Sequence, residues 1–124
     1  MLAPLPAAVE PADTASFRRQ IAKDMWANWH PAWLRMVAAQ HYLDGARHTR
    51  VAARLYGNLT PDIHVEEISR ETAYLCAVHD LMLTPAARKT DLKWKLSTRK
   101  FDGGRPQWER QIELDEARLN GGEA

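Results

Sequence analysis

Apolar residues recur at helical spacing along most of the chain, and this period constrains the fold more than any other feature of the sequence. Side chains three, four or seven residues apart lie on the same face of an α-helix. Three such series are Phe17, Ile21, Met25 and Trp29; Ile68, Leu75 and Met82; and Trp108, Ile112 and Leu119. The sequence therefore predicts an all-α fold, a small bundle of about five helices in one domain.

Proline, glycine and capping residues divide this pattern into elements. Residues 1–12 are rich in proline and predict a disordered arm, residues 13–120 a single helical domain, and residues 121–124 a flexible tail. Pro31 disfavours helical geometry in the residue before it, so the first helix is expected to end or kink near Trp29-His30. Gly45 either ends the second helix or is tolerated inside a longer one. Thr60-Pro61 and Thr84-Pro85 predict two further helix starts.

Residues 91–98 fit two periods at once. Leu92, Trp94 and Leu96 alternate with polar residues, as in a half-buried strand. A strand needs a partner, and we find no second alternating segment in the chain. The helix is therefore favoured, unless the strand pairs with another chain. In a helix, Trp94 lies roughly opposite Leu92 and Leu96, so it either packs under another element or stands exposed as a contact.

Composition excludes several classes of protein. The single cysteine excludes an internal disulfide, and the absence of zinc-ligand spacings excludes a zinc finger. The N-terminus lacks the basic start and apolar run of a signal peptide, and no apolar stretch is long enough for a membrane span. We expect a cytoplasmic protein that does not bind membranes. The formal charge of +1 gives no global attraction for nucleic acid.

Charge is nevertheless segregated along the chain. Residues 62–80 contain five acids and one arginine, whereas residues 88–110 contain eight basic residues and three acids. An acidic helix and a basic helix are expected, which either pair with each other or face different partners.

Two polar constellations have the spacing of a site. His41, Asp44 and His48 would share a face of an unbroken helix and could ligate a metal, although the simpler interpretation is a polar cluster at the core. The second constellation is His64, Glu67 and Glu71 on the acidic helix. A salt-bridged face toward the basic helix explains it more simply than acid/base catalysis. We predict no catalytic residue, cofactor or metal.

Cys76 and the tryptophans have simple explanations as core residues. Cys76 lies in an apolar run, which predicts a buried and unreactive thiol. Trp26, Trp29 and Trp33 would share a face if the helix ran through Pro31. Such a stripe could stack bases or grip a side chain, but core packing is the favoured interpretation.

The basic helix is the strongest candidate for a binding surface. It combines positive charge with an aromatic side chain, the elements of a surface that tracks phosphates and stacks bases. A solvated face, with aliphatic stems covering apolar surface, is the alternative. The candidate partner-binding residues are Lys89, Lys93, Trp94, Lys95, Arg99 and Lys100.

The stretch HDLMLTPAARKTDLKWKL resembles a segment of short helical proteins encoded by bacteriophages and prophages of alphaproteobacteria. The resemblance covers about residues 72–119 and departs from the family in its lysine content. It implies an all-helical phage accessory protein, and it assigns no catalytic residues. We therefore predict a non-enzymatic interaction protein, such as an inhibitor or accessory protein that binds a host or virion protein. The alternative is a nucleic-acid binder that uses the basic helix 85–100, and the oligomeric state stays open.

Overall fold

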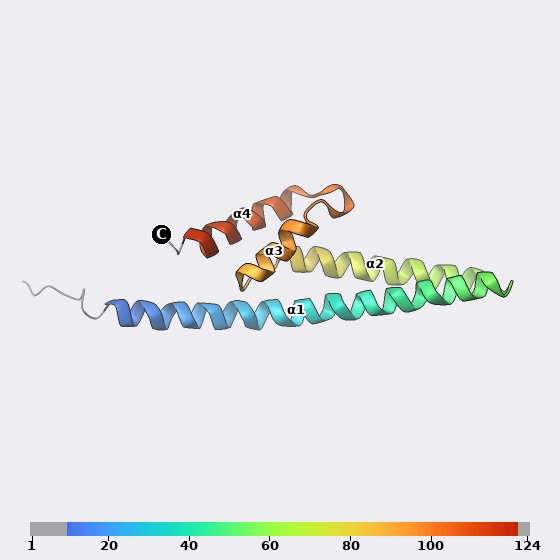
Figure 1. Ribbon diagram of the computed structural model, residues 1–124, viewed down its shortest axis with the longest axis horizontal. Helices are drawn as coiled ribbons and strands as arrows, with labels where there is room; N and C mark the ends of the chain where they lie inside the picture. The colour runs from blue at the N-terminus through green and yellow to red at the C-terminus, as the bar shows by residue number, and fades with distance from the viewer. Residues whose placement is uncertain (1–9, 122–124) are drawn as a thin grey trace, which may run out of the picture.

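The computed structural model describes residues 10–121, apart from the side chains of residues 10–13 and of Asp102. Within this range the chain is helical, which confirms the predicted fold class (Figure 1). There are four α-helices, where the sequence predicted about five. They are α1 (Glu10–Leu55), α2 (Pro61–Leu83), α3 (Lys89–Thr98) and α4 (Pro106–Gly121), with a short 3-10 helix, η2 (Phe101–Gly103), before the last.

The helix count differs because α1 continues through two expected breaks. Pro31 lies inside this 46-residue helix, which is about 69 Å long. Of the two alternatives near Trp29-His30, the end of the helix was therefore wrong, and the tolerated Gly45 is what the structure shows. Trp29 and Ala32 are both buried in the core on either side of Pro31. Their packing offsets the backbone hydrogen bond that proline removes.

A row of alanines on α1 forms its contact with α2. Alanines recur every seven residues, at 32, 39, 46 and 53, and none of them is exposed. Larger residues precede each of them by three positions: Trp29, Met36, Leu43 and Arg50. This is the a/d spacing of two helices packed along a seam. Alanine at every second seam position lets the two helices approach closely.

The two helices form an antiparallel hairpin. The turn between them contains Gly57 at φ +71°, a left-handed conformation that glycine adopts without strain. Figure 1 shows α2 beside the C-terminal half of α1, with α3 and α4 gathered at the other end of α2. We call the paired part of α1 and α2 the arm. The head is the part where α3 and α4 join them.

The core lies in the head, where all four helices meet. It contains Trp29 and Met36 of α1 and Leu81 and Met82 of α2, with Leu92 of α3. Trp108 and Ile112 of α4 complete it. The indole N–H of Trp108 donates a hydrogen bond to Nδ1 of His79 over 2.9 Å, which satisfies the polar atom of this buried ring.

The disputed segment is helical, since residues 91–98 belong to α3. Its start was mispredicted, however, because Thr84-Pro85 does not begin a helix. The helix begins at Lys89, where the Asp91 carboxylate accepts a hydrogen bond from the Arg88 backbone N–H over 2.9 Å. Residues 84–88 form a linker instead, and side chains of α4 bind the linker through hydrogen bonds. The backbone N–H of Ala86 donates to Asp115 Oδ1 at 3.1 Å, and the Ala86 carbonyl accepts from Arg118.

The chain ends were only partly as expected. Residues 10–12 of the N-terminal segment that was predicted to be disordered belong to α1, and α4 extends to Gly121. The rest of that segment, residues 1–9, and the end of the predicted tail, residues 122–124, lie outside the described residues. Across the described residues, no helix combines the length and the apolar character that crossing a membrane requires.

Candidate functional site

Lys95, one of the six residues predicted to bind a partner, lies inside the head. Its side chain is 0 % exposed, and Nζ is 2.6 Å from Oδ2 of Asp115 on α4. The ammonium also donates to the Thr84 carbonyl. Burial lowers the pKa of Lys95 below its ordinary value of 10.5, although the hydrogen bond to Asp115 opposes the shift. Lys95 is therefore a structural residue, and it is not available to a partner.

Asp115 connects three parts of the head. Its carboxylate accepts hydrogen bonds from Lys95, from the Ala86 backbone and from the side chains of Gln111 and Arg118. A buried carboxylate is costly unless its lone pairs are filled, and these donors fill them. The network ties α3, the linker and α4 together.

Trp94 is half-buried against α1, which resolves the question of whether it is exposed. Its ring lies edge-on to Trp33, with centroids 5.5 Å apart, and to Trp29, with centroids 6.1 Å apart. The ring therefore does not stand between Lys93 and Lys95 as a free contact. The remaining candidates on and after α3 are Lys89, Lys93 and Lys100, which are exposed, and Arg99, which is half-buried. Arg99 lies 3.9 Å from Glu109.

The tryptophans expected to share a face do so and meet α3. Trp29 and Trp33 are nearly parallel, with centroids 6.3 Å apart, and Trp26 stacks on His30 at 4.7 Å. The rings surround a cavity of about 320 Å³, which we call the aromatic cavity. Its lining residues are Trp26, Trp29, His30, Trp33, Arg88, Thr90, Asp91 and Trp94. The favoured core packing holds for Trp29, which is buried, and for Trp33, which packs against the core, whereas Trp26 is 38 % exposed.

A second cavity adjoins the first and has a different character. It has a volume of about 470 Å³, and we call it the cationic cavity. It is lined by Arg19, Ala22, Lys23, Trp26, Ala87 and Arg88. Trp26 and Arg88 line both cavities. Arg88 lies over the ring of Trp26 at 4.3 Å and is also bound to Asp91.

The sequence contained a signal for this pair of cavities. Arg19, Lys23, Trp26 and His30 follow one another at intervals of four, three and four. That spacing places two cations and two aromatic rings on one face of a helix.

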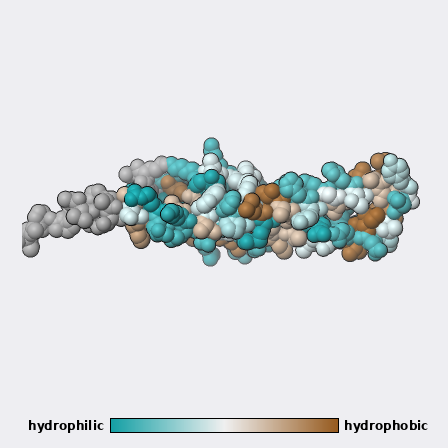
Figure 2. Space-filling model, turned by 90° about the horizontal axis from the view of Figure 1, so that it is seen from below, coloured by the Kyte–Doolittle hydropathy of each residue, from teal (hydrophilic) through white to brown (hydrophobic). Residues whose placement is uncertain are grey.

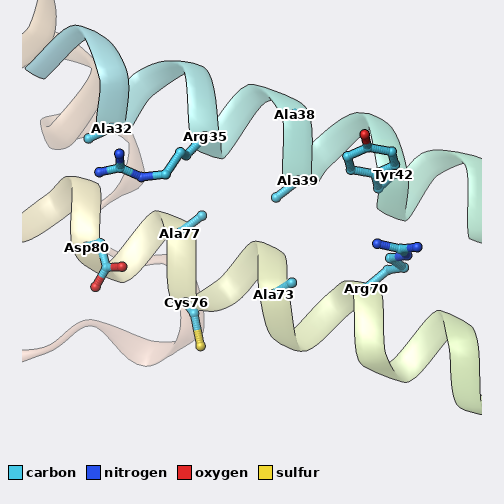
Figure 3. A pocket seen from close by; sticks show the side chains of 10 residues that line it. All are labelled: Ala32, Arg35, Ala38, Ala39, Tyr42, Arg70, Ala73, Cys76, Ala77 and Asp80. Atoms are coloured by element: carbon cyan, nitrogen blue, oxygen red, sulfur yellow. The ribbon is translucent and has the colours of Figure 1, made fainter.

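The arm carries a groove between α1 and α2 (Figure 3). Its volume is about 480 Å³. Five alanines line it: Ala32, Ala38 and Ala39 from α1, and Ala73 and Ala77 from α2. Arg35 and Asp80 lie at one end of the groove, and Tyr42 and Arg70 lie at the other (Figure 3).

Cys76 also lines this groove, and its thiol is exposed. The prediction of a buried cysteine was therefore wrong. Tyr74 and Val78, two residues away on either side, pack toward the core, whereas Cys76 does not. Local composition could not distinguish these directions.

The far end of the arm exposes a group of apolar side chains, which we call the tip patch. Leu55 is 79 % exposed and Tyr56 is 83 % exposed. Val51, Leu59 and Val65 are the other members of the patch. Figure 2 shows hydrophobic surface gathering at this end of the molecule.

In the part of the chain that the structure describes, neither polar constellation is gathered into a metal site. His41, Asp44 and His48 lie on exposed positions of α1. Across residues 10–121, no group of three or more histidine, cysteine or acidic side chains is arranged to hold a metal ion. In the second constellation, Glu67 forms a salt bridge of 2.6 Å with Arg50 of α1. The expected ion pair therefore forms on the acidic helix, but with α1 rather than with the basic helix.

Comparison of the chain with protein-family models, curated proteins and solved structures finds no match. The resemblance to phage-encoded helical proteins therefore stays a prediction that rests on its residues.

Proposed function

We propose that this chain is a non-enzymatic interaction protein whose arm binds a helix of a partner protein. The observation that carries the proposal is the groove with an alanine floor between α1 and α2 (Figure 3). An amphipathic helix laid into an apolar groove is a recurring mode of peptide recognition.

The shape of the groove suits a helix. Alanine side chains on both walls leave room for a third helix to approach at the usual interaxial distance of about 8–10 Å. The middle of the groove is apolar, and charged residues lie at its ends: Arg35 and Asp80 at one, Arg70 at the other. This pattern of an apolar centre and a polar rim is typical of protein interfaces.

The construction of the arm supports the same proposal. Two helices pair through one seam, and within residues 10–121 no third helix lies along the outer part of the arm (Figure 1). Leu34 and Ile68 are both about half exposed, and the tip patch extends the apolar surface to the end of the arm. Exposed apolar surface of this kind marks interaction sites. By the resemblance above, the partner would be a host or virion protein of a phage.

The single cysteine provides a direct test. A photoactivatable cross-linker attached to Cys76 should capture a partner from an extract of cells that naturally contain the protein. The partner, once identified and purified, should protect the Cys76 thiol from alkylation in the unmodified protein. Ala38→Phe and Ala73→Phe fill the groove from exposed positions, so each should abolish both capture and protection.

The matched control is Ala117→Phe, which places the same ring on an exposed position of α4. Capture and thiol protection should be unchanged in that variant, and circular dichroism should show all three variants folded. Capture that survives both groove substitutions would rule out the groove as the binding site.

A further inference from the structure

We propose that, in the absence of another partner, the groove of the arm is covered by the arm of a second copy of this chain, in an antiparallel dimer. The dimer rests on the proposed function, because it gives the same groove an occupant. A two-fold axis through the middle of the groove, perpendicular to the helices, relates the two copies, so each copy offers the same surface to the other.

The two ends of the groove carry charges that an antiparallel copy complements. Asp80 is exposed at one end, and its carboxylate has no hydrogen bond or ion pair within residues 10–121. Arg70, at the other end, binds Glu66 through Nε, so its other nitrogens can take a second carboxylate. An antiparallel copy brings its own Asp80 to Arg70. Arg35 then meets the ring of Tyr42, which is 60 % exposed.

The face of α1 that lines the groove continues past both ends of the groove. Alternating steps of four and three residues lead from Ala38 back to Ile21 and Phe17, and forward to Tyr56, which directly follows α1. Phe17 is 66 % exposed and Tyr56 is 83 % exposed. Ile21 lies seventeen positions before Ala38, and Tyr56 lies eighteen after it. Antiparallel copies therefore set Tyr56 of one beside Ile21 of the other.

A parallel dimer would use the same surface less completely. It would place α1 of one copy on α2 of the other, and α2 lies beside only the C-terminal half of α1 (Figure 1). Phe17 and Ile21 would then extend past the end of that helix without a counterpart. Asp80 would face Arg35 rather than Arg70, and this difference in pairing can be tested.

Cys76 lies close to the proposed axis. On α2 the groove extends from Arg70 to Asp80, and Cys76 is one position from the midpoint of that range. The thiol is exposed in the single chain. Ala38 and Ala73, which are also small and exposed, let the two arms approach closely at this level. The two Cys76 thiols, one from each copy, therefore meet at the centre of the interface.

The first test is the mass of the purified full chain by sedimentation equilibrium. A reversible equilibrium between one and two chains is expected between about 1 and 100 μM. Asp80→Arg should raise the dissociation constant by about tenfold or more at low salt, because like charges then face each other at both ends. Adding Arg70→Asp should restore the dimer. The control, Asp44→Arg, makes the same charge change at an exposed position of α1 outside the groove, and it should have an effect below about twofold.

Cross-linking tests the direction of the two arms. A short bismaleimide should join the two Cys76 residues of the unmodified dimer. In a Cys76→Ser background, a mixture of Ile21→Cys chains and Tyr56→Cys chains should cross-link to each other, whereas either variant alone should not. Circular dichroism should show that every variant is folded.

Four outcomes would overturn the dimer. These are a single chain at every concentration, an unchanged dissociation constant in Asp80→Arg, rescue by Arg35→Asp in place of Arg70→Asp, and no cross-link between the two cysteine variants.

Capture and thiol protection test the proposed function separately, at dilutions where the chain is monomeric. A chain that never dimerises, but whose thiol an identified partner protects, would remove the dimer alone. A dimer that Ala38→Phe dissociates while capture survives would remove the proposed function alone.

Discussion

The arm and the head of this molecule are held together in different ways. In the arm, two helices pack through alanines, and the one ion pair across the described seam, Arg50–Glu67, is partly exposed. In the head, four helices surround large aromatic rings and the fully buried pair of Lys95 and Asp115. The arm can therefore leave surface free for a partner, whereas the head buries charged side chains that fix its geometry.

The largest effect is expected from breaking the buried pair. Lys95→Met should reduce the free energy of unfolding by about 3–5 kcal/mol, because Asp115 would be left buried without its cation. Arg50→Met in the arm should cost about 1 kcal/mol or less, because that pair is partly exposed to water. Urea denaturation measures both losses.

Two further variants make this comparison strict. Lys93→Met changes an exposed lysine on the same helix and should alter stability by no more than about 0.5 kcal/mol. The double variant Lys95→Met/Asp115→Leu should lose less than the sum of the two single losses, since neither charge is left alone. Additive losses would show that the pair does not act as a unit.

The second effect concerns the close approach of the helices in the arm. Ala53→Leu places three extra carbons in the buried seam and should destabilise the protein by about 1–3 kcal/mol through overpacking. Ala52→Leu makes the same change at the adjacent, exposed position and should have an effect within about 0.5 kcal/mol. Thermal unfolding followed by circular dichroism measures the stability of both variants. Equal losses of stability would contradict the close packing of Ala53 against α2.

These two regions also differ in how far the sequence predicts them. Helical period identified the helices of both, because apolar residues recur at helical spacing in each. It did not show that α1 continues through Pro31, since this depends on Trp29 and Ala32 packing against other elements. The burial of Lys95 was equally hidden. Its partner, Asp115, is twenty residues away in the sequence. A run of lysines predicts a solvated face, and only the packing of α4 against α3 brings the carboxylate to Lys95.

A smaller effect separates two glycines of the arm. Gly45 lies inside α1 with nothing within 4 Å of an added Cβ, so Gly45→Ala should raise the free energy of unfolding by about 0.5–1 kcal/mol. Gly57 also faces open space, but its φ is +71°. Gly57→Ala should therefore destabilise the hairpin by about 1 kcal/mol. Chemical denaturation of both variants tests this, and effects of the same sign would contradict the continuous helix or the strained turn.

The smallest effect is a dependence of stability on pH that belongs to the head. Burial lowers the pKa of Lys95 in the folded protein, whereas in the unfolded chain it returns to about 10.5. Between these two values the unfolded chain binds more protons at this site than the folded chain does. The contribution of Lys95 to stability therefore rises with pH across that window and is constant below it.

The measurement is the difference in unfolding free energy between the unmodified protein and Lys95→Met, followed from neutral pH toward 10.5. Other titrating groups are common to both proteins, so they largely cancel. The difference should increase in favour of the unmodified protein as the pH rises. A difference that stays flat would mean that the carboxylate of Asp115 compensates fully for the burial of Lys95. The ion pair would then hold α3 to α4 without the desolvation cost that sets the head apart from the arm.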